Sequence, residues 1–210
     1  MRKYQIDEHY FDVIDSEAKA YFLGYVFTNG SIEKNRDVIQ VIARNGQSDI
    51  IDILRATICK DPKNMMTITK GPDGSGHRIR LYSTIMVAAL RKHGFIGLKH
   101  TRIPPPELPD ELDKHFIRGL FDGGGCIFKE KNSPTKIRTV VVVIASHFLL
   151  QFIQTHMAEN LSIKPKTQHQ SGTGKNGKIK YCSAIDIGKV IHYLYYGAEI
   201  YIKNGIGSHI

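Results

Sequence analysis

The chain has 210 residues, a length that suits one large hydrophobic core or two closely joined domains of about 100 residues each. Its 29 lysines and arginines exceed its 20 aspartates and glutamates, for a formal charge of +9. This excess favours a polyanionic partner, with nucleic acid ahead of an acidic membrane surface. Hydrophobic residues make up 41% of the chain, an ordinary globular value that argues against disorder.

Two further features limit where the protein works and what holds it together. The longest apolar run, residues 140–145, is far too short to cross a bilayer, and the first residues carry many charges. We therefore expect no membrane partner and an intracellular location, in the cytoplasm or nucleoid, or in an organelle if the gene is organellar. Cys59, Cys126 and Cys182 are widely spaced, which disfavours both a disulfide framework and a structural zinc site.

The predicted elements of the first half follow the order helix, two strands, helix, two strands, helix. Apolar residues with a period of 3.6 indicate helices, and alternating residues indicate strands. These patterns cover residues 16–30 (helix), 38–43 (strand), 48–58 (helix), 67–84 (two strands around a glycine-rich turn) and 83–94 (helix). The prolines that follow cannot continue a helix and favour an extended path across the molecule.

The second half repeats this layout, and such an internal repeat is typical of a two-unit fold. The segment that starts at Thr167 matches the one that starts at Thr67 without a gap, and the strand that starts at Val140 resembles the one that starts at Val38. We therefore predict an N-terminal repeat over residues 1–100, a proline-rich linker over 101–109 and a C-terminal repeat over 110–210.

A nine-residue pattern lies near the start of each half. Residues 22–30, FLGYVFTNG, and residues 117–125, IRGLFDGGG, both resemble the LAGLIDADG motif of the homing-endonuclease family. The resemblance extends over nearly the whole chain, because the motifs, strand pairs and trailing helices occur in the family's order. It implies an α+β fold of two pseudo-symmetric αββαββα repeats, in which two antiparallel sheets form a DNA-binding saddle and the motif helices pack together at the repeat interface.

The same resemblance implies a function. Members of the family bind long double-stranded DNA sites and hydrolyse both strands with magnesium, so we expect a double-stranded DNA partner and a magnesium cofactor. Because one chain already carries both repeats, we expect a monomer on a long asymmetric target, whereas a homodimer would read a palindrome.

Small residues on the motif helices are suited to close helix packing. Gly24 and Thr28 stand four residues apart, as do Gly119 and Gly123, and residues at this spacing share one helical face. We predict that these faces form the helix interface, which would explain glycine in a helix interior at a cost of about 1 kcal/mol. The alternative is that these glycines only mark soft helix ends.

Both motifs lack the acid with which the family binds metal. That acid lies just before the last motif glycine, so the resemblance places Asn29 and Gly124 at the two catalytic and metal-ligand positions. Magnesium prefers charged oxygen ligands, so we expect weak or lost metal binding and little or no DNA cleavage. Asp122 lies about 200° round the helix from Gly124 and is expected to be structural. We expect Gly124→Asp to be sterically acceptable, with its side chain pointing toward DNA.

Basic and amide side chains on the free face of each sheet are the candidates for DNA contacts, because the other face packs on helices. In the first half they are Lys34, Arg36, Gln40, Arg44, Lys70, His77, Arg78 and Arg80. In the second half they are Lys129, Lys131, Arg138, Gln168, Gln170, Lys175, Lys178 and Lys180. The family also places basic residues near its cleavage centre, and the candidates for this role are Lys99 and Lys203. For any single residue, a solvated surface position is the alternative.

Three functions stay open at this level. The first is a site-specific DNA-binding protein of the homing-endonuclease type that has lost most or all cleavage, by natural decay or by deliberate substitution. The second is an RNA-binding maturase that assists intron splicing. The third is a transcriptional regulator that kept the fold and lost the chemistry. The target site, and whether the gene lies in an intron, in an intein or free between genes, are not encoded in these patterns.

Overall fold

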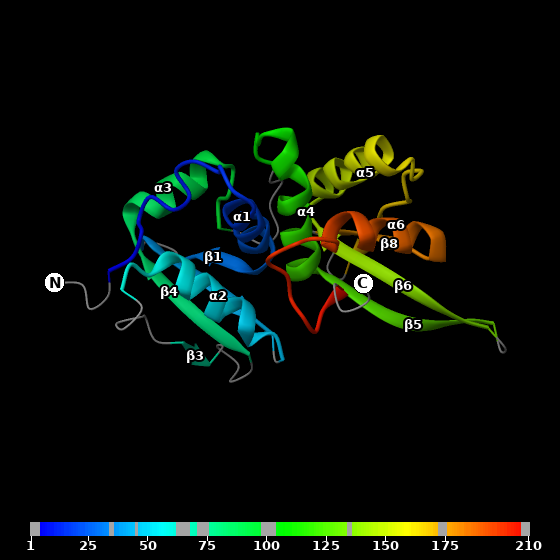
Figure 1. The fold of residues 1–210 in the computed structure, drawn as a ribbon, viewed down its shortest axis with the longest axis horizontal. Helices are drawn as coiled ribbons and strands as arrows, with labels where there is room; N and C mark the ends of the chain where they lie inside the picture. The colour runs from blue at the N-terminus through cyan, green and yellow to red at the C-terminus, as the bar shows by residue number, and fades with distance from the viewer. Residues whose placement is uncertain are drawn as a thin grey trace.

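The two repeats are visible in the structure, a computed structural model that describes residues 5–33, 36–44, 46–61, 68–70, 76–97, 104–133, 136–171 and 176–206. Each half has the order αββαββα, with one antiparallel four-stranded sheet and three helices (Figure 1). The predicted α+β fold class is therefore confirmed. Within these ranges, no helix combines the length and the apolar character that crossing a membrane requires.

In the first half, Ser16 caps the start of the motif helix. The Ser16 hydroxyl accepts a hydrogen bond from the backbone N–H of Lys19, and this satisfies one of the N–H groups that a helix start leaves unpaired. The elements are α1 (Glu17–Asn29), β1 (Gly30–Ile32), β2 (Val38–Ala43), α2 (Ser48–Ile58), β3 (Thr69–Lys70), β4 (His77–Tyr82) and α3 (Thr84–Lys92).

The second half repeats these elements with a longer hairpin. They are α4 (Asp110–Gly124), β5 (Gly125–Ser133), β6 (Lys136–Ala145), α5 (His147–Leu161), β7 (His169–Ser171), β8 (Asn176–Tyr181) and α6 (Ala184–Tyr195). β5 and β6 have 9 and 10 residues, whereas β1 and β2 have 3 and 6. The outer part of β5 and β6 forms a two-stranded arm that extends away from the centre of the molecule (Figure 1).

The two sheets have equivalent topology and register. Their strand orders are β1-β2-β4-β3 and β5-β6-β8-β7. Gly30, the last residue of the first motif, pairs with Val41, and Gly125, the last residue of the second, pairs with Val143. In β4 and β8, alternate residues are buried against helices, as the period-2 pattern predicted, whereas β6 buries the four consecutive residues 140–143. The opposite surface of each sheet is called its free face below.

The motif helices lie side by side at the centre of the molecule (Figure 1). The ring of Phe27 in α1 meets the ring of Phe116 in α4 edge to face, with their centroids 5.3 Å apart, and the ring of Phe95 packs on the same Phe27 side chain. Buried apolar residues of both halves form one continuous cluster. The core therefore passes through the repeat interface and fixes the two sheets relative to each other.

Candidate nucleic-acid interface

Glycines bring the backbones of the two motif helices together. A Cβ atom built on Gly24 would lie 2.1 Å from the carbonyl oxygen of Phe116, and one built on Gly119 would lie 2.1 Å from the carbonyl oxygen of Tyr21. A Cβ on Gly123 would meet the hydroxyl of Thr28 at 1.9 Å. The four small residues singled out from the sequence thus meet at the contact between α1 and α4. Any larger residue at Gly24 or Gly119 would push the helices apart.

The C-terminal ends of α1 and α4 bring Asn29 and Gly124 to the middle of the molecule. The amide of Asn29 lies beside Gly123, since a Cβ on that glycine would be 2.6 Å from its Nδ2 atom. A Cβ on Gly124 would lie 2.5 Å from the carbonyl oxygen of Ile144. The expectation that Gly124→Asp is sterically acceptable is therefore wrong, because the β6 backbone occupies the space into which the side chain would project.

Asp122 is structural, as the sequence predicted. Its side chain is only 4% exposed, and its carboxylate accepts hydrogen bonds from the hydroxyls of Tyr21 and Tyr195, each at 2.8 Å, and from the backbone N–H of Ile202 at 2.9 Å. Burial raises the pKa of Asp122 to about 6, although these three donors and Arg118 act in the opposite direction. Its two oxygens are therefore occupied by groups of the protein itself.

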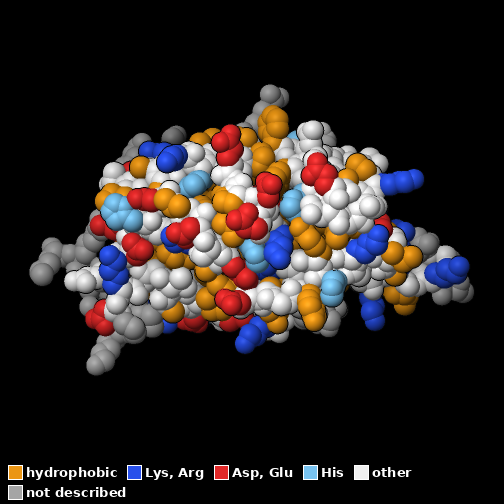
Figure 2. All heavy atoms as spheres, turned by 45° about the horizontal axis from the view of Figure 1, so that its top comes forward, with side chains coloured by type: hydrophobic (Ala, Val, Ile, Leu, Met, Phe, Trp, Pro, Cys, Tyr) orange, Lys and Arg blue, Asp and Glu red, His pale blue; other side chains and the backbone are white. Residues whose placement is uncertain are grey.

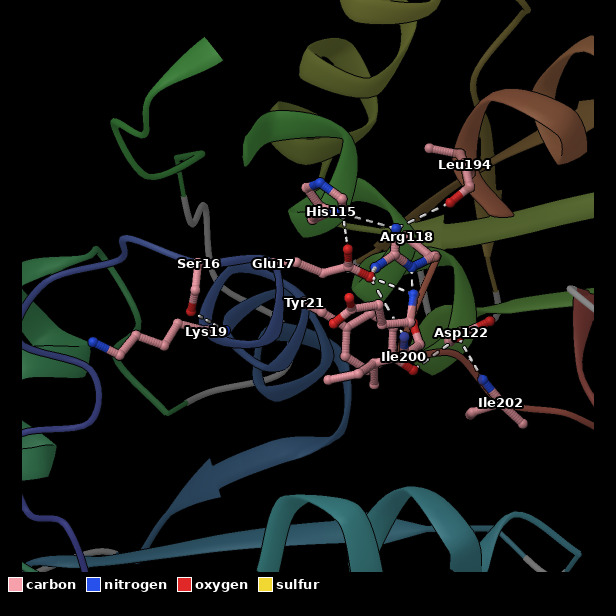
Figure 3. A network of polar contacts seen from close by, with 11 residues as sticks. Ser16, Glu17, Lys19, Tyr21, His115, Arg118, Asp122, Leu194, Ile200 and Ile202 are labelled. Atoms are coloured by element: carbon pink, nitrogen blue, oxygen red, sulfur yellow. Dashed lines mark hydrogen bonds and ion pairs between the residues drawn. The ribbon is translucent and has the colours of Figure 1, made fainter. Parts of the chain in front are cut away.

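Arg118, one turn before Asp122 on α4, is a site residue that the sequence patterns did not single out. It is 1% exposed, and its guanidinium donates to the carboxylate of Glu17 at 2.6 Å and to the backbone carbonyls of Leu194 and Ile200 at 3.0 and 2.9 Å (Figure 3). Burial, followed by the charge of Arg118, lowers the pKa of His115 to about 4. His115 is therefore neutral at pH 7, and its Nδ1 accepts a hydrogen bond from Arg118 at 2.9 Å.

These contacts form one buried polar cluster, the Arg118–Asp122 network, that joins three separate parts of the chain. Glu17 comes from α1, Arg118 and Asp122 from α4, and Ile200 and Ile202 from the segment after α6 (Figure 3). The pairing of Arg118 with Asp122 at a spacing of four residues was the one sequence signal available, because both residues then share a helical face. Their burial could be known only from the fold.

The segment after α6 returns to the molecular centre and carries Lys203. Asp122 holds the backbone of Ile202, Ile206 lies against Gly125, and the Asn204 side chain reaches the Gly46 carbonyl of the first half at 3.4 Å. Lys203 is exposed between these anchored neighbours, so it is a candidate for a central phosphate contact. The other candidate, Lys99, lies outside the described residues.

The side chains at the helix ends do not suit magnesium. Asn29 offers one neutral amide oxygen, and Gly124 has no side chain. Asp122, the one acid of the second motif, is committed to three donors of the protein. Across the described ranges, no three His, Cys, Asp or Glu side chains gather in a way that could hold a metal ion. Such a set of ligands does not fit a cation that prefers charged oxygens.

The free face of the first sheet presents three of the predicted contact residues together. Gln40 of β2 lies opposite Arg80 of β4, and Arg78 lies two pairs further along, opposite Ile42. The Arg78 guanidinium contacts the Gln40 side-chain oxygen at 3.4 Å. Glu33, after β1, accepts a hydrogen bond from Gln40 at 2.8 Å and forms an ion pair with Arg80. A row of donors and one acceptor therefore crosses three strands of this face.

The free face of the second sheet has an equivalent row. Lys180 and Lys178 of β8 hold the same places relative to their motif as Arg80 and Arg78, since Ile79 pairs with Val41 and Ile179 with Val143. Arg138 of β6 faces Glu130 of β5. The Glu130 carboxylate accepts from Arg138 at 2.8 Å and from Lys180 at 3.0 Å. Each free face thus combines cations with one acid.

Five predicted contact residues lie on the opposite surface of their strands. His77 pairs with buried Ala43 and with Lys70, Gln170 pairs with Gly177 next to α5, and Lys129 and Lys131 share the face of Ile127. The expectation that they lie on the free face is wrong, because side chains alternate along a strand and each of these residues is an odd number of positions from a free-face residue. The residues concerned are Lys70, His77, Lys129, Lys131 and Gln170.

The remaining candidates lie at strand ends or outside the described chain. Arg36 and Arg44 flank β2 and are exposed, which suits contacts with phosphates more than with base edges. The side chain of Gln168 is bonded to His147 at the start of α5 at 2.8 Å. Lys34 and Lys175 fall among the residues whose structure is not described.

Acidic side chains mark the face that bears the helix starts. Figure 2, which turns the top of Figure 1 toward the viewer, shows carboxylates over the middle of this face with basic side chains mainly toward its edges. The first turns of the motif helices contribute acids here, namely Glu17, Asp110, Glu111 and Asp113. Negative charge at a helix N-terminus is favourable for the helix, and it makes this face unsuitable for a polyanion.

Comparisons with known proteins agree with this architecture. Residues 111–202 match the family model described as a LAGLIDADG-like domain. No curated protein matches the sequence. The LAGLIDADG homing endonuclease I-LtrWI, solved bound to target DNA, is 11% identical with a TM-score of 0.57, over 97% of this chain and 88% of that one.

Two further solved structures have the same fold. Meganuclease I-SmaMI, bound to uncleavable DNA with a TTGT central four, is 13% identical with a TM-score of 0.61, over 94% of this chain and 87% of that one. The N-terminal LAGLIDADG domain of DUF199/WhiA is 12% identical with a TM-score of 0.57, over 89% and 87%. Two motifs, two matching sheets and the domain match thus lead to one conclusion: residues 111–202 form a LAGLIDADG-like domain, and the whole chain has the two-repeat fold of these solved structures.

Proposed function

We propose that this protein is a site-specific binder of double-stranded DNA that reads a long, asymmetric site with the free faces of its two sheets and does not cut it. The observation that carries the proposal is the matching register of Arg78 and Arg80 on one sheet with Lys178 and Lys180 on the other. Two equivalent cationic rows on sheets held rigidly by a shared core suit two half-sites of one duplex.

The distribution of charge supports this orientation on DNA. The formal charge is +9, yet carboxylates gather over the middle of the face that bears the helix starts (Figure 2). The free faces carry the arginines and lysines described above, and the two related endonucleases were solved bound to DNA. A duplex placed against the free faces would meet the cations and avoid the acidic turns.

The helix ends support binding without cleavage. Asn29 and Gly124 supply no charged oxygen where the family carries its acids, and the Ile144 carbonyl fills the space beside Gly124. A magnesium ion would therefore lack both of the carboxylates that neutralise charge and lower the pKa of an attacking water. The chain's own groups at this point, the Asn29 amide and the Lys203 ammonium, suit holding a phosphate.

Selection from a random duplex library, followed by binding measurements on the selected site, tests the proposal. We expect a single protein monomer per duplex in light scattering. The affinity should fall steeply with salt, because a plot of the logarithm of the binding constant against the logarithm of the salt concentration has a slope of about −0.9 for each phosphate contact. A supercoiled plasmid carrying the site should stay intact in magnesium as it does in chelator. A flat salt dependence would remove DNA as the partner, and efficient cutting would contradict the assignment of the helix ends.

The absence of both acids also suits a regulator, the second candidate. Such a protein would need DNA binding and would need no cleavage, so its selected site should lie upstream of a gene and not at an insertion point. The maturase alternative makes a different prediction, namely tighter binding to structured intron RNA than to duplex DNA. Parallel titrations with both nucleic acids at one salt concentration separate these functions.

A further inference from the structure

We propose that Glu33 and Glu130 are specificity-determining residues of the interface, each holding the cationic side chains of its free face and penalising sequence-independent binding to phosphates. This inference rests on the proposed DNA-binding function. It assigns a role to the two acids on surfaces that otherwise collect positive charge.

The first sheet shows how the acid is placed. Glu33 follows β1, and its backbone N–H bonds the Val38 carbonyl at 2.9 Å, which extends the β1–β2 ladder by one pair and directs its side chain to the free face. The carboxylate then accepts from Gln40 at 2.8 Å and pairs with Arg80. The Arg80 side chain as a whole is 33% exposed, so the part of the guanidinium that Glu33 does not hold can reach a ligand.

The second sheet reaches the same arrangement from a different sequence position. Glu130 comes five residues after the motif glycine Gly125, whereas Glu33 comes three residues after Gly30. Its two oxygens divide between Arg138 at 2.8 Å and Lys180 at 3.0 Å, and these two partners lower the pKa of the Glu130 carboxyl. The acid is therefore ionised at neutral pH and holds one cation from β6 and one from β8.

Both acids pair with the same strand position, and this coincidence carries the argument. Arg80 and Lys180 follow Ile79 and Ile179, which hold equivalent places in their sheets. A chain selected only for affinity to a polyanion would not place a carboxylate against this position in both halves, because the acid repels phosphates. An acid that fixes the direction of a cation improves the discrimination of the protein between its specific site and unrelated DNA. The reason is that a base edge offers acceptors in defined directions, whereas a phosphate accepts hydrogen bonds from many directions.

The two acids should therefore lower affinity for unrelated DNA more than for the selected site. Removing the charge frees a cation for any phosphate, so sequence-independent binding gains while the directed contact with a base edge is lost. Specificity is a difference between two affinities, and both changes reduce it.

The test uses Glu33→Gln and Glu130→Gln in the full chain, with Glu111→Gln as the matched control. Glu111 is exposed in the first turn of α4, on the acidic face, so the control makes the same charge change away from the free faces. Dissociation constants are measured for the selected duplex and for a scrambled duplex over a range of salt. Thermal melting confirms that each variant is folded, and Glu33→Met and Glu130→Met, which also remove the charge at a similar side-chain length, replace any variant that is not.

We expect the ratio of the two dissociation constants to fall by about 5-fold or more for each Gln variant, the discrimination that one specified base pair supplies. The scrambled duplex should bind more tightly, with a logarithmic salt slope steeper by about 0.9 for each cation released. Base-pair substitutions should show that Glu33→Gln relaxes one half-site and Glu130→Gln the other. A ratio and slope equal to those of Glu111→Gln would overturn the inference. Failure of the unmodified chain to bind any duplex would instead overturn the proposed function.

Discussion

The two motif helices occupy equivalent places, but at two matching positions α1 has apolar side chains and α4 has charged ones. Gly24 and Gly119 are the matching contact points, so Leu23 and Phe27 of α1 correspond to Arg118 and Asp122 of α4. In the first half these positions are filled by apolar side chains that join the common core. In the second half they hold a buried arginine and a buried carboxylate that bind the segment after α6.

The difference shows that a repeated fold can keep its backbone contacts while one copy gains a further task. At Leu23 and Phe27, α1 only packs, and apolar side chains do this without hydrogen-bonding partners. α4 also anchors the returning segment with Lys203, and main-chain groups of that segment require hydrogen-bonding partners when they are buried. The polar pair supplies those partners at the cost of burying two charges.

Arg118→Ala should produce the largest effect on this contrast. The change would leave the Leu194 and Ile200 carbonyls without their donor and Glu17 without its cation, so we expect a loss of about 3–5 kcal/mol in the free energy of unfolding. Urea unfolding measures this loss. Arg91→Ala, on an exposed position of α3, is the control and should change stability by less than about 0.5 kcal/mol. Equal effects of the two variants would mean that the buried arginine contributes little.

Asp122→Asn should show that the stability contributed by α4, unlike that of α1, depends on pH. Burial raises the pKa of Asp122 to about 6 from 3.8, so the folded chain holds this proton more tightly than the unfolded chain. The contribution of Asp122 to stability should therefore be greatest below about pH 4 and should fall as the pH rises to about 6, by about 3 kcal/mol in all. Asparagine does not titrate, so the difference in unfolding free energy between the wild type and the variant should shrink over this range.

Urea unfolding of both proteins at pH 4, 5, 6 and 7 measures this change. Leu23→Ala, at the matching position of Arg118 in α1, should show a loss of stability that does not vary with pH over this range. If the difference in unfolding free energy between wild type and Asp122→Asn is the same at pH 4 and pH 7, folding does not raise the pKa of Asp122, and the prediction is wrong.

Restoring the missing acids should have different effects on stability at the two helix ends. Asn29→Asp replaces one side chain by another of the same shape and should fold normally. Gly124→Asp must displace the Ile144 backbone, since even its Cβ would lie 2.5 Å from that carbonyl oxygen. We expect a loss of about 1–3 kcal/mol from such overpacking.

Cleavage assays complete this comparison. Because Gly124→Asp disturbs the junction of α4 with β6, the variant with both acids should fail to restore efficient double-strand cleavage of the bound site in magnesium. Gly124→Ala is the control for the steric part of the effect, because it adds the Cβ without the charge. A double variant that is as stable as the wild type and cuts rapidly would show that the β6 backbone at Ile144 can shift to accommodate the new side chain at little cost in stability.

Arg80→Ala and Lys180→Ala should sharpen the comparison of the two sheets. Each residue holds the equivalent place on its free face, so each change should relax discrimination within one half-site only, by about 1–3 kcal/mol where the contact is bidentate to a base. Arginine offers such a fork and lysine does not, so the arginine change should be the larger. Binding to a panel of single base-pair variants measures both effects. A uniform loss across all sequences would identify a phosphate contact.

Much of this arrangement could be predicted from local patterns. The repeat, the order of the elements and the helix contact at Gly24 and Gly119 all follow from spacing along the chain, because helices and strands have fixed periods. The same periods could have shown that His77 and Arg78 point to opposite faces. The structural role of Asp122 also followed from its angle on the helix.

Other features depended on contacts between residues far apart in the sequence. The sequence alone determined two αββαββα repeats, a cationic chain and motifs without acids. Only the tertiary structure decided that Arg118 is buried beside Glu17, that Glu33 and Glu130 lie against the cations of their free faces, and that the Ile144 carbonyl closes the space at Gly124. The physical reason is that spacing sets the face on which a side chain lies, whereas the packing of distant segments sets what meets it there.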